Sequence, residues 1–310
     1  MRGSTAWLDP YLARLGLPDP GEPSPAALIA LHRAHIERIA YENIDIQLGR
    51  PPGIDPAESI QRILAGRGGY CFNLNGALCT LLAALGYRVT RHLGAVHGPD
   101  FTPRPDQYGN HMAVTVDVDG QTWMIDAGLG TAHHDPMPLT AGEHRQGPFT
   151  FRLDRFTPES AAGSGAGPDA GFWRFTQDPA LSSGSFLAMD FSLAPARWTD
   201  FLTHHVELST APTSSFVKTA QVCRRDATGA DVIVGRVLKR IEGAGSHNER
   251  ELGTAGAWFE AATDVFGLNL SGIEPADRER LWRRIRVAHE ARLAARDATD
   301  ESAAPASASP

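Results

Sequence analysis

Apolar residues in the first third of the chain repeat at helical spacing. Five leucines within Leu74–Leu85 lie on one face of an α-helix that follows Cys71. Gly86 is typical of the residue that ends such a helix. Two earlier helices are indicated by their first residues, Ser24-Pro25 and Asp55-Pro56, because Ser and Asp cap a helix and proline fits its first turn.

From Tyr87 onward the pattern changes to short apolar runs that alternate with polar residues, which is typical of β-strands. Asp119-Gly120 separates two such runs and predicts a tight hairpin, because this dipeptide tolerates the left-handed backbone of the turn. The expected strands are 87–96, 111–118, 121–127, 149–156, 172–177, 185–193, 216–224 and 231–237, with a Gly/Ser/Ala-rich loop at 158–170 and helices near 24–40, 55–66, 72–86, 197–208, 254–266 and 275–296.

Helices first, a run of strands next and a mixed end predict an α+β protein in three segments. We expect a helical segment over 1–86, a β-segment over 87–195 and a mixed segment over 196–296. The remaining residues, 297–310, are rich in Ala, Ser and Pro and are expected to be a disordered tail.

Charge and composition narrow the function classes. The 310 residues carry a formal net charge of −7 without clusters of Lys or Arg, which argues against a nucleic-acid or anionic-membrane partner. The longest apolar stretch, 76–87, is too short to span a bilayer, and the first ten residues lack a signal-peptide core. Three cysteines without a C-x-x-C pair exclude a disulfide framework, so we expect a cytoplasmic protein.

Cys71 is the first candidate for chemistry. It follows Gly68-Gly69-Tyr70 at the start of a predicted helix, where the positive end of the helix dipole favours a thiolate. The glycine pair permits a sharp turn and close approach of a ligand. We interpret Cys71 as a nucleophile; the alternative is a small buried apolar residue, as expected for Cys79 and Cys223.

His111 and Asp126 lie on the two arms of the predicted hairpin. A two-residue turn at 119–120 places Asp126 opposite Ala113, so His111 is its diagonal neighbour on the same face, at a Cα separation of about 7–8 Å. This geometry predicts a Cys-His-Asp triad, in which His111 is the base and Asp126 orients it. Each residue taken alone is more often structural.

Other polar features give weaker signals. Gly128 and Gly130 after Asp126 permit close approach of a pantetheine or phosphate group, although a plain turn is the alternative. His133-His134 lacks the spacing of a metal-binding helix, so we expect no metal. The charged stretch Arg278–Arg296 favours a solvated helix, with partner binding as the alternative.

Several motifs together resemble the arylamine N-acetyltransferase family. Arg67-Gly-Gly-Tyr-Cys71-Phe-Asn-Leu-Asn75 is similar to the cysteine motif of that family, and the resemblance extends over about residues 11–270. The further matching segments are Tyr41–Ile46, Asn110–Met112, Asp126–Gly130 and Ser209–Phe216.

The resemblance implies an N-terminal helical bundle, a central antiparallel β-barrel-like domain and a C-terminal α/β lid around a core similar to papain-like cysteine enzymes. It also implies ping-pong acyl transfer from acetyl-CoA as the donor to a small-molecule amine, without a metal. The residue roles that it implies are Cys71, His111 and Asp126 for catalysis, Tyr41, Leu129 and Phe216 for the acceptor pocket, Gly128 and Gly130 beside the CoA pantetheine, and Arg67, Glu42 and Asn75 as supporting residues.

Three positions depart from the motifs of bacterial family members: Asn73 stands for Glu, Leu129 for Phe, and Tyr41 for Phe. The favoured function is acetylation of an arylamine, hydrazine or N-hydroxyarylamine. Two alternatives remain within acyl chemistry: a macrolactam-forming amide synthase of a polyketide pathway, and a cysteine hydrolase, because a triad alone does not choose between amine and water as acceptor. A binding module without catalysis on the same scaffold is the third alternative, and the intact triad argues against it.

Overall fold

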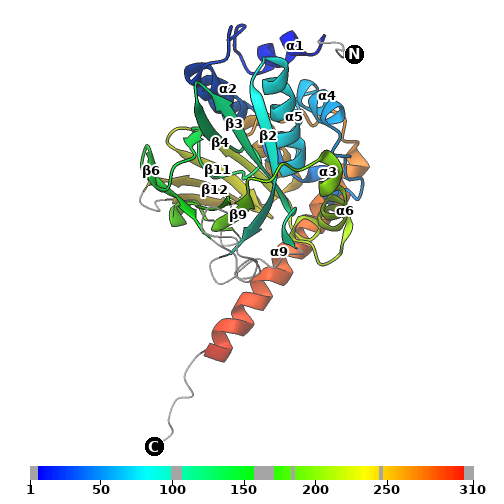
Figure 1. The fold of residues 1–310 in the computed structure, drawn as a ribbon. Coiled ribbons are helices and arrows are strands. Elements are labelled where there is room, and N and C mark those ends of the chain that lie inside the picture. The colour runs from blue at the N-terminus through cyan, green and yellow to red at the C-terminus, as the bar shows by residue number, and fades with distance from the viewer. Residues whose placement is uncertain (1–5, 99–106, 157–170, 183–185, 244–246, 304–310) are drawn as a thin grey trace, which may run out of the picture.

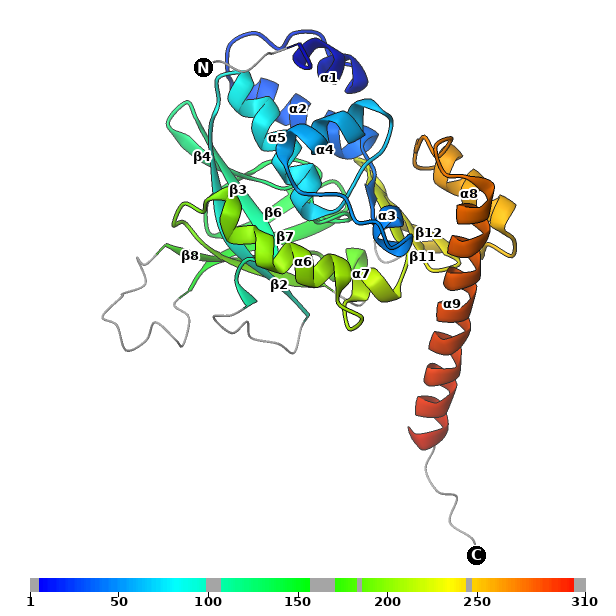
Figure 2. The same ribbon diagram turned by 90° about the vertical axis from the view of Figure 1, so that its right-hand side faces the viewer.

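The computed structural model describes residues 6–98, 107–156, 171–182, 186–243 and 247–303. The first helices of the chain gather near the N-terminus, at the top of Figure 1, and two antiparallel sheets lie below and beside them. The last helix packs along one side and extends away from the body (Figure 2). The chain has the expected α+β fold with a barrel-like sheet and a papain-like core.

The helices of the N-terminal bundle begin where the sequence predicts. The Ser24 hydroxyl accepts a hydrogen bond from Ala27 N at 3.2 Å, and the Asp55 carboxylate accepts one from Ala57 N at 2.8 Å. Gly86 has φ +91°, a left-handed backbone that favours glycine after a helix. The helices in this part are α1 (Leu8–Arg14), α2 (Pro25–Arg38), α3 (Ile44–Gln47), α4 (Pro56–Leu64) and α5 (Cys71–Ala84); α1 and α3 were not predicted.

The larger sheet has eight strands in the order β5-β4-β3-β2-β9-β8-β7-β6, and all neighbours are antiparallel. Strands β2 and β3 pack against α5, and residues of α5 and β3 contribute to the main hydrophobic core. The strands are β2 (Arg88–His97), β3 (His111–Val118), β4 (Gln121–Ile125), β5 (Met137–Pro138), β6 (Gly142–Gln146), β7 (Phe149–Arg155), β8 (Phe172–Thr176) and β9 (Ala188–Ser192).

The hairpin between β3 and β4 has the predicted register. Asp119 and Gly120 have φ values of 51° and 74°, so both turn residues are left-handed. Val114 pairs with Ile125, which places Asp126 opposite Ala113 as expected. Both faces of β3 are buried, and α5 packs against this strand.

The smaller sheet has the order β1-β10-β11-β12-β13. The strand expected over 216–224 is partly wrong: Ser214 caps the short helix α7 (Ser215–Lys218), and the strand starts at Gln221. The Gln47 amide donates to the carbonyl of Val217 at 3.1 Å, and this tertiary contact holds the turn in place. The strands are β1 (Tyr41–Glu42), β10 (Gln221–Arg225), β11 (Gly229–Val234), β12 (Val237–Glu242) and β13 (His247–Glu251).

The C-terminal helices cover the smaller sheet. Leu281 and Ile285 of α9 are buried in a second core with Trp258 and Phe266. The helix α9 continues to residue 303, beyond residue 296 where the sequence placed its end, because alanine and charged residues sustain a helix. The remaining elements are η3 (Pro179–Leu181), η4 (Trp198–Phe201), α6 (Leu202–Thr210), α8 (Ala255–Asp264) and α9 (Pro275–Ala303).

Two expected segments lie largely outside the described residues. They are the Gly/Ser/Ala-rich loop at 158–170 and the end of the expected tail, 304–310. Among the residues that the structure describes, helices are too short or too polar to cross a membrane.

Candidate active site

A glycine turn presents Cys71 as the first residue of α5. Gly68 allows the chain to pass β1 closely, since a Cβ on it would lie 1.8 Å from the carbonyl oxygen of Ala40. Gly69 pairs with Tyr41 in a parallel bridge, and its carbonyl accepts a hydrogen bond from Glu42 N at 2.9 Å. The turn is therefore held by backbone contacts, and Cys71 is buried with 3% of its surface exposed.

Buried ion pairs lie beneath this turn. Arg67 donates to Glu42 at 2.8 Å, and Arg62 contacts the same carboxylate at 3.2 Å. Asp45 completes the cluster at 3.1 Å from Arg67. Burial alone lowers the pKa of Arg67, but the two carboxylates outweigh burial and raise it. The structure thus brings Arg67 and Glu42 together and adds Arg62 and Asp45, which the sequence analysis missed.

His111 lies between Asp126 and Cys71. Its Nε2 is 2.7 Å from a carboxylate oxygen of Asp126, and Cys71 lies close enough to help raise the pKa of the ring. Burial opposes the charged imidazolium, yet Asp126 and Cys71 together raise the pKa of His111 to about 10. The imidazolium is therefore the favoured form at neutral pH, and it faces the cysteine.

The Asp126 carboxylate is fixed by more than His111. Asn75, one turn after Cys71 on α5, donates to its Oδ1 at 2.9 Å, and Gly128 N donates to the same oxygen at 2.8 Å. The Asn75 amide also accepts from Ala127 N at 2.8 Å. Asn75 therefore joins the nucleophile helix directly to the loop that carries Asp126.

Gly128 packs against the nucleophile itself. A Cβ on this residue would lie 2.6 Å from Cα of Cys71 and 2.9 Å from its Cβ. Such distances do not occur between heavy atoms that are not bonded, so any side chain here would displace the loop or the cysteine. The glycine is required by close approach rather than by an unusual φ.

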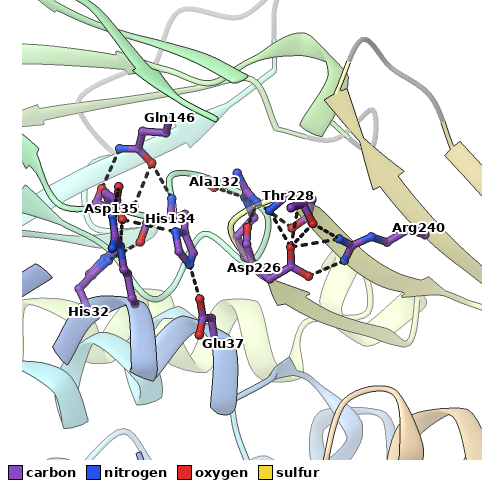
Figure 3. A network of polar contacts seen from close by, with 12 residues as sticks. His32, Glu37, Ala132, His134, Asp135, Gln146, Asp226, Thr228 and Arg240 are labelled. Atoms are coloured by element: carbon purple, nitrogen blue, oxygen red, sulfur yellow. Dashed lines mark hydrogen bonds and ion pairs between the residues drawn. The ribbon is translucent and has the colours of Figure 1, made fainter. Parts of the chain in front are cut away.

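A polar layer that contains His32, Glu37 and His134 supports the same loop (Figure 3). The backbone N–H of Asp126 donates to Nε2 of His32 at 3.2 Å, and Nδ1 of His32 bonds to the carbonyl of His134 at 3.0 Å. Burial keeps the pKa of His32 well below its usual range, so the neutral ring has a free lone pair for Asp126. His134 in turn contacts Glu37 at 2.7 Å.

The other end of this layer joins the smaller sheet. Arg225, buried at the end of β10, donates through Nε to the carbonyl of Ala132 at 3.0 Å. Its guanidinium stacks over Phe149 at 4.6 Å. The following residue, Asp226, pairs with Arg240 at 2.7 Å, as Figure 3 shows. This layer positions the loop after Asp126 from both sides, and the sequence analysis did not find it.

A cavity of about 480 Å³ opens beside Cys71 and His111. The rings of Tyr41 and Phe216 form part of its wall at a centroid separation of 6.5 Å. The cavity therefore gathers around the cysteine all five residues that the resemblance assigns to the acceptor pocket and the CoA pantetheine. The other described lining residues are Val96, Asn110, Gly128, Leu129, Gly130, Thr131, Phe186, Leu208, Ser215, Thr219, Gln221, Cys223, Val234 and Arg292.

The remaining cysteines differ from Cys71 in their surroundings. Burial raises the pKa of both Cys79 and Cys223 to about 12, so they stay protonated at neutral pH. Cys223 lies in the cavity wall, opposite Tyr41 in the sheet, which the sequence did not predict. Of these three thiols in the described structure, that of Cys71 acts on the pKa of His111.

His205 of α6 contacts the residue that precedes the nucleophile. Its Nδ1 lies 2.5 Å from the hydroxyl of Tyr70, the residue before the nucleophile. Helix α6 is thereby attached to the cysteine turn. No group of three or more metal-ligating side chains is placed to hold an ion within the described parts of the chain.

A buried cysteine at a helix N-terminus, a histidine on the facing strand and an aspartate behind it define the class of papain-like cysteine enzymes. Residues 26–274 match the family model described as N-acetyltransferase. The chain therefore belongs to the arylamine N-acetyltransferase family.

Three relatives illustrate this membership. The arylamine N-acetyltransferase of Nocardia farcinica superposes with a TM-score of 0.76 at 30% identity, over 90% of this chain and 97% of that one. The Mycobacterium marinum enzyme in complex with CoA gives 0.75 at 26%, over 90% and 98%. The arylamine N-acetyltransferase / N-hydroxyarylamine O-acetyltransferase of Salmonella typhimurium is 37% identical over 130 residues, which cover 41% of this chain and 44% of that relative.

Proposed function

We propose that the chain transfers an acetyl group from acetyl-CoA, through a thioester on Cys71, to an arylamine, hydrazine or N-hydroxyarylamine. The observation that carries this proposal is the hydrogen bond between His111 and Asp126 next to Cys71, with Cys71 and His111 both lining a cavity of about 480 Å³. The CoA complex of the Mycobacterium marinum relative supports the donor. The names of the relatives support the acceptor class.

In the first half-reaction the Cys71 thiolate attacks the carbonyl carbon of the donor thioester. The raised pKa of His111 provides the imidazolium that protonates the departing CoA thiolate. The new bond joins the acetyl carbon to Sγ of Cys71, and the bond to the CoA sulfur breaks. The oxyanion is expected at the N-terminal N–H groups of α5, which lack acceptors within the helix.

In the second half-reaction the amine attacks the Cys71 thioester. His111, now neutral, accepts the proton that the amine loses, and the bond to Sγ breaks. This restores the thiolate and the imidazolium. Weakly basic aromatic amines suit the step because they are unprotonated nucleophiles at neutral pH.

Intact mass spectrometry tests the first half-reaction. Incubation with acetyl-CoA should add one acetyl group to the protein, and Cys71→Ser should abolish both this addition and turnover. Cys79→Ser is the matched control, because Cys79 is equally buried on the same helix but lies about two turns beyond Cys71 and outside the lining of the cavity, and this variant should still be acetylated.

Discharge of the acetylated enzyme tests the second half-reaction. An aniline should remove the acetyl group from Cys71 much faster than buffer alone and appear as the N-acetylated product. Equal rates with and without amine would contradict the proposal and identify water as the acceptor. Absence of acetyl on Cys71 after incubation with donor would contradict it at the first step.

A further inference from the structure

The wall of the cavity at Cys71 includes a permanently charged side chain, which belongs to the C-terminal helix α9. Arg292 of α9 lines the same cavity as Cys71 and His111. Among the described lining residues, Arg292 is the one with a permanently charged side chain, and none is Asp or Glu. The family match ends at residue 274, so Arg292 lies outside it.

Helix α9 holds Arg292 toward the body of the protein. Leu281, Ile285 and His289 form a buried stripe along the helix, and Arg292 continues that stripe. The guanidinium Nη2 of Arg292 lies 3.3 Å from Nδ1 of His289. Burial and the neighbouring guanidinium lower the pKa of His289, so its neutral ring accepts this hydrogen bond and orients the arginine.

The nearby acidic side chains are engaged elsewhere. Glu251 pairs with Arg236 at 2.6 Å, and Glu290 lies 3.6 Å from Arg286. In the described part of the chain, carboxylates form no ion pair with Arg292. The guanidinium therefore has its charge available for an anion that enters the cavity.

We propose that Arg292 recognises a phosphate group of the acyl-thioester donor. This inference rests on the proposed function, because it names a contact for the donor of that reaction. A guanidinium fits a phosphate with two parallel hydrogen bonds. The net charge of −7 repels a phosphorylated donor, so one cation at the cavity has a large effect on its capture.

The acceptor fits this position less well than the donor. It must reach Cys71 as a neutral amine and give its proton to His111, and a guanidinium assists neither step. The phosphate next to pantetheine is common to CoA and to the phosphopantetheine arm of a carrier protein, whereas the nucleotide phosphates belong to CoA alone. The chemistry recognised is the phosphate, and donors of different length separate the two sources.

The experiment compares Cys71 acetylation by four donors: acetyl-CoA, acetyl-3′-dephospho-CoA, S-acetyl-4′-phosphopantetheine and the uncharged S-acetyl-pantetheine. Arg292→Gln should reduce kcat/KM for acetyl-CoA by about 10- to 100-fold, the range of a charge-assisted hydrogen-bond pair. It should leave S-acetyl-pantetheine unchanged, and Arg292→Lys should retain part of the activity. Arg283→Gln, an exposed position on the same helix, is the matched control and should behave as the unmodified protein.

The outcomes separate this inference from the proposed function. A loss that includes S-acetyl-4′-phosphopantetheine assigns the contact to the phosphate shared with a carrier protein, and a loss confined to the CoA donors assigns it to the nucleotide. An equal loss with S-acetyl-pantetheine would indicate a merely structural role and overturn the inference, as would no loss with acetyl-CoA. If the unmodified protein accepted acetyl from no donor, the proposed function itself would fail.

Discussion

The two ends of the cavity are built in different ways. At the Cys71 end the polar side chains are buried and bonded: the Asp126 carboxylate contacts His111, Asn75 and Gly128 N within 2.9 Å. Around Leu129, which we call the packed end, the wall is held by apolar contacts instead. The bonded end tolerates little change because each side chain positions another. The packed end can change shape by substitution, so it is where the choice of acceptor is expected to vary.

Apart from loss of the nucleophile itself, the largest effect should come from Asp126→Asn at the bonded end. The amide removes the charge that favours the imidazolium of His111. Acetylation of Cys71 should fall by up to about 10⁴-fold, the loss caused by the equivalent Asp-to-Asn substitution in a serine protease. Stopped-flow measurement of the acetylation burst checks this. Near-normal acetylation by the folded variant would show that another group orients His111.

The same variant should change the pH dependence. The raised pKa of His111 means that its imidazolium persists through neutral pH and is lost only as the pH rises toward about 10. Acetylation by the unmodified protein should therefore decline only near that pH, because the departing thiolate needs the proton. In Asp126→Asn the decline should begin at lower pH, and an unshifted decline would contradict the assignment.

Gly128→Ala should give the next largest effect. A Cβ 2.6 Å from Cα of Cys71 forces the loop or the nucleophile to move, and a displacement of about 1 Å costs about 100-fold in rate. Acetylation kinetics and thermal melting are measured together, because overpacking also lowers stability. Gly272→Ala is the control, since a Cβ there meets no atom within 4 Å. Equal activity of the two variants would contradict the packing argument.

The smallest effect is expected at the packed end. Leu129→Phe adds a ring to the cavity that Tyr41 and Phe216 also line, and one aromatic contact contributes about 0.5–1.5 kcal/mol. The kcat/KM for aniline should rise by a factor of about 2 to 13, while Cys71 acetylation should barely change. Leu129→Met adds length without a ring and serves as the control. Slower aniline turnover with intact acetylation would indicate a pocket shaped for a bulkier acceptor.

Local signals in the sequence were sufficient for much of the fold. The Asp119-Gly120 turn defined both the β3–β4 hairpin and its register, because both residues take the left-handed conformation that this dipeptide favours. The helix caps at Ser24 and Asp55 were equally local. The polar edge strands β6 and β13 escaped notice because exposed polar residues do not alternate with a buried face.

The same difference between local and long-range contacts applies to the active site. His111 and Asp126 could be brought together from sequence, since one hairpin carries both. His32 and Arg292 could not, because their contacts depend on how α2 and α9 pack against distant loops. The helix over 215–218 was missed for a similar reason: side chains from residues 43 and 47 bind its carbonyl groups.

The short strand β1 has a consequence for the order in which parts of the chain fold. Tyr41 pairs with Gly69 beside the nucleophile and with Cys223 of β10, so it is shared by segments that are far apart in the chain. The three residues of the triad lie within 71–126, but the cavity wall that faces them includes residues 215–223. During synthesis the thiol therefore emerges well before its enclosure. The binding site is complete only after this long-range pairing, one of the slower kinds of contact to form.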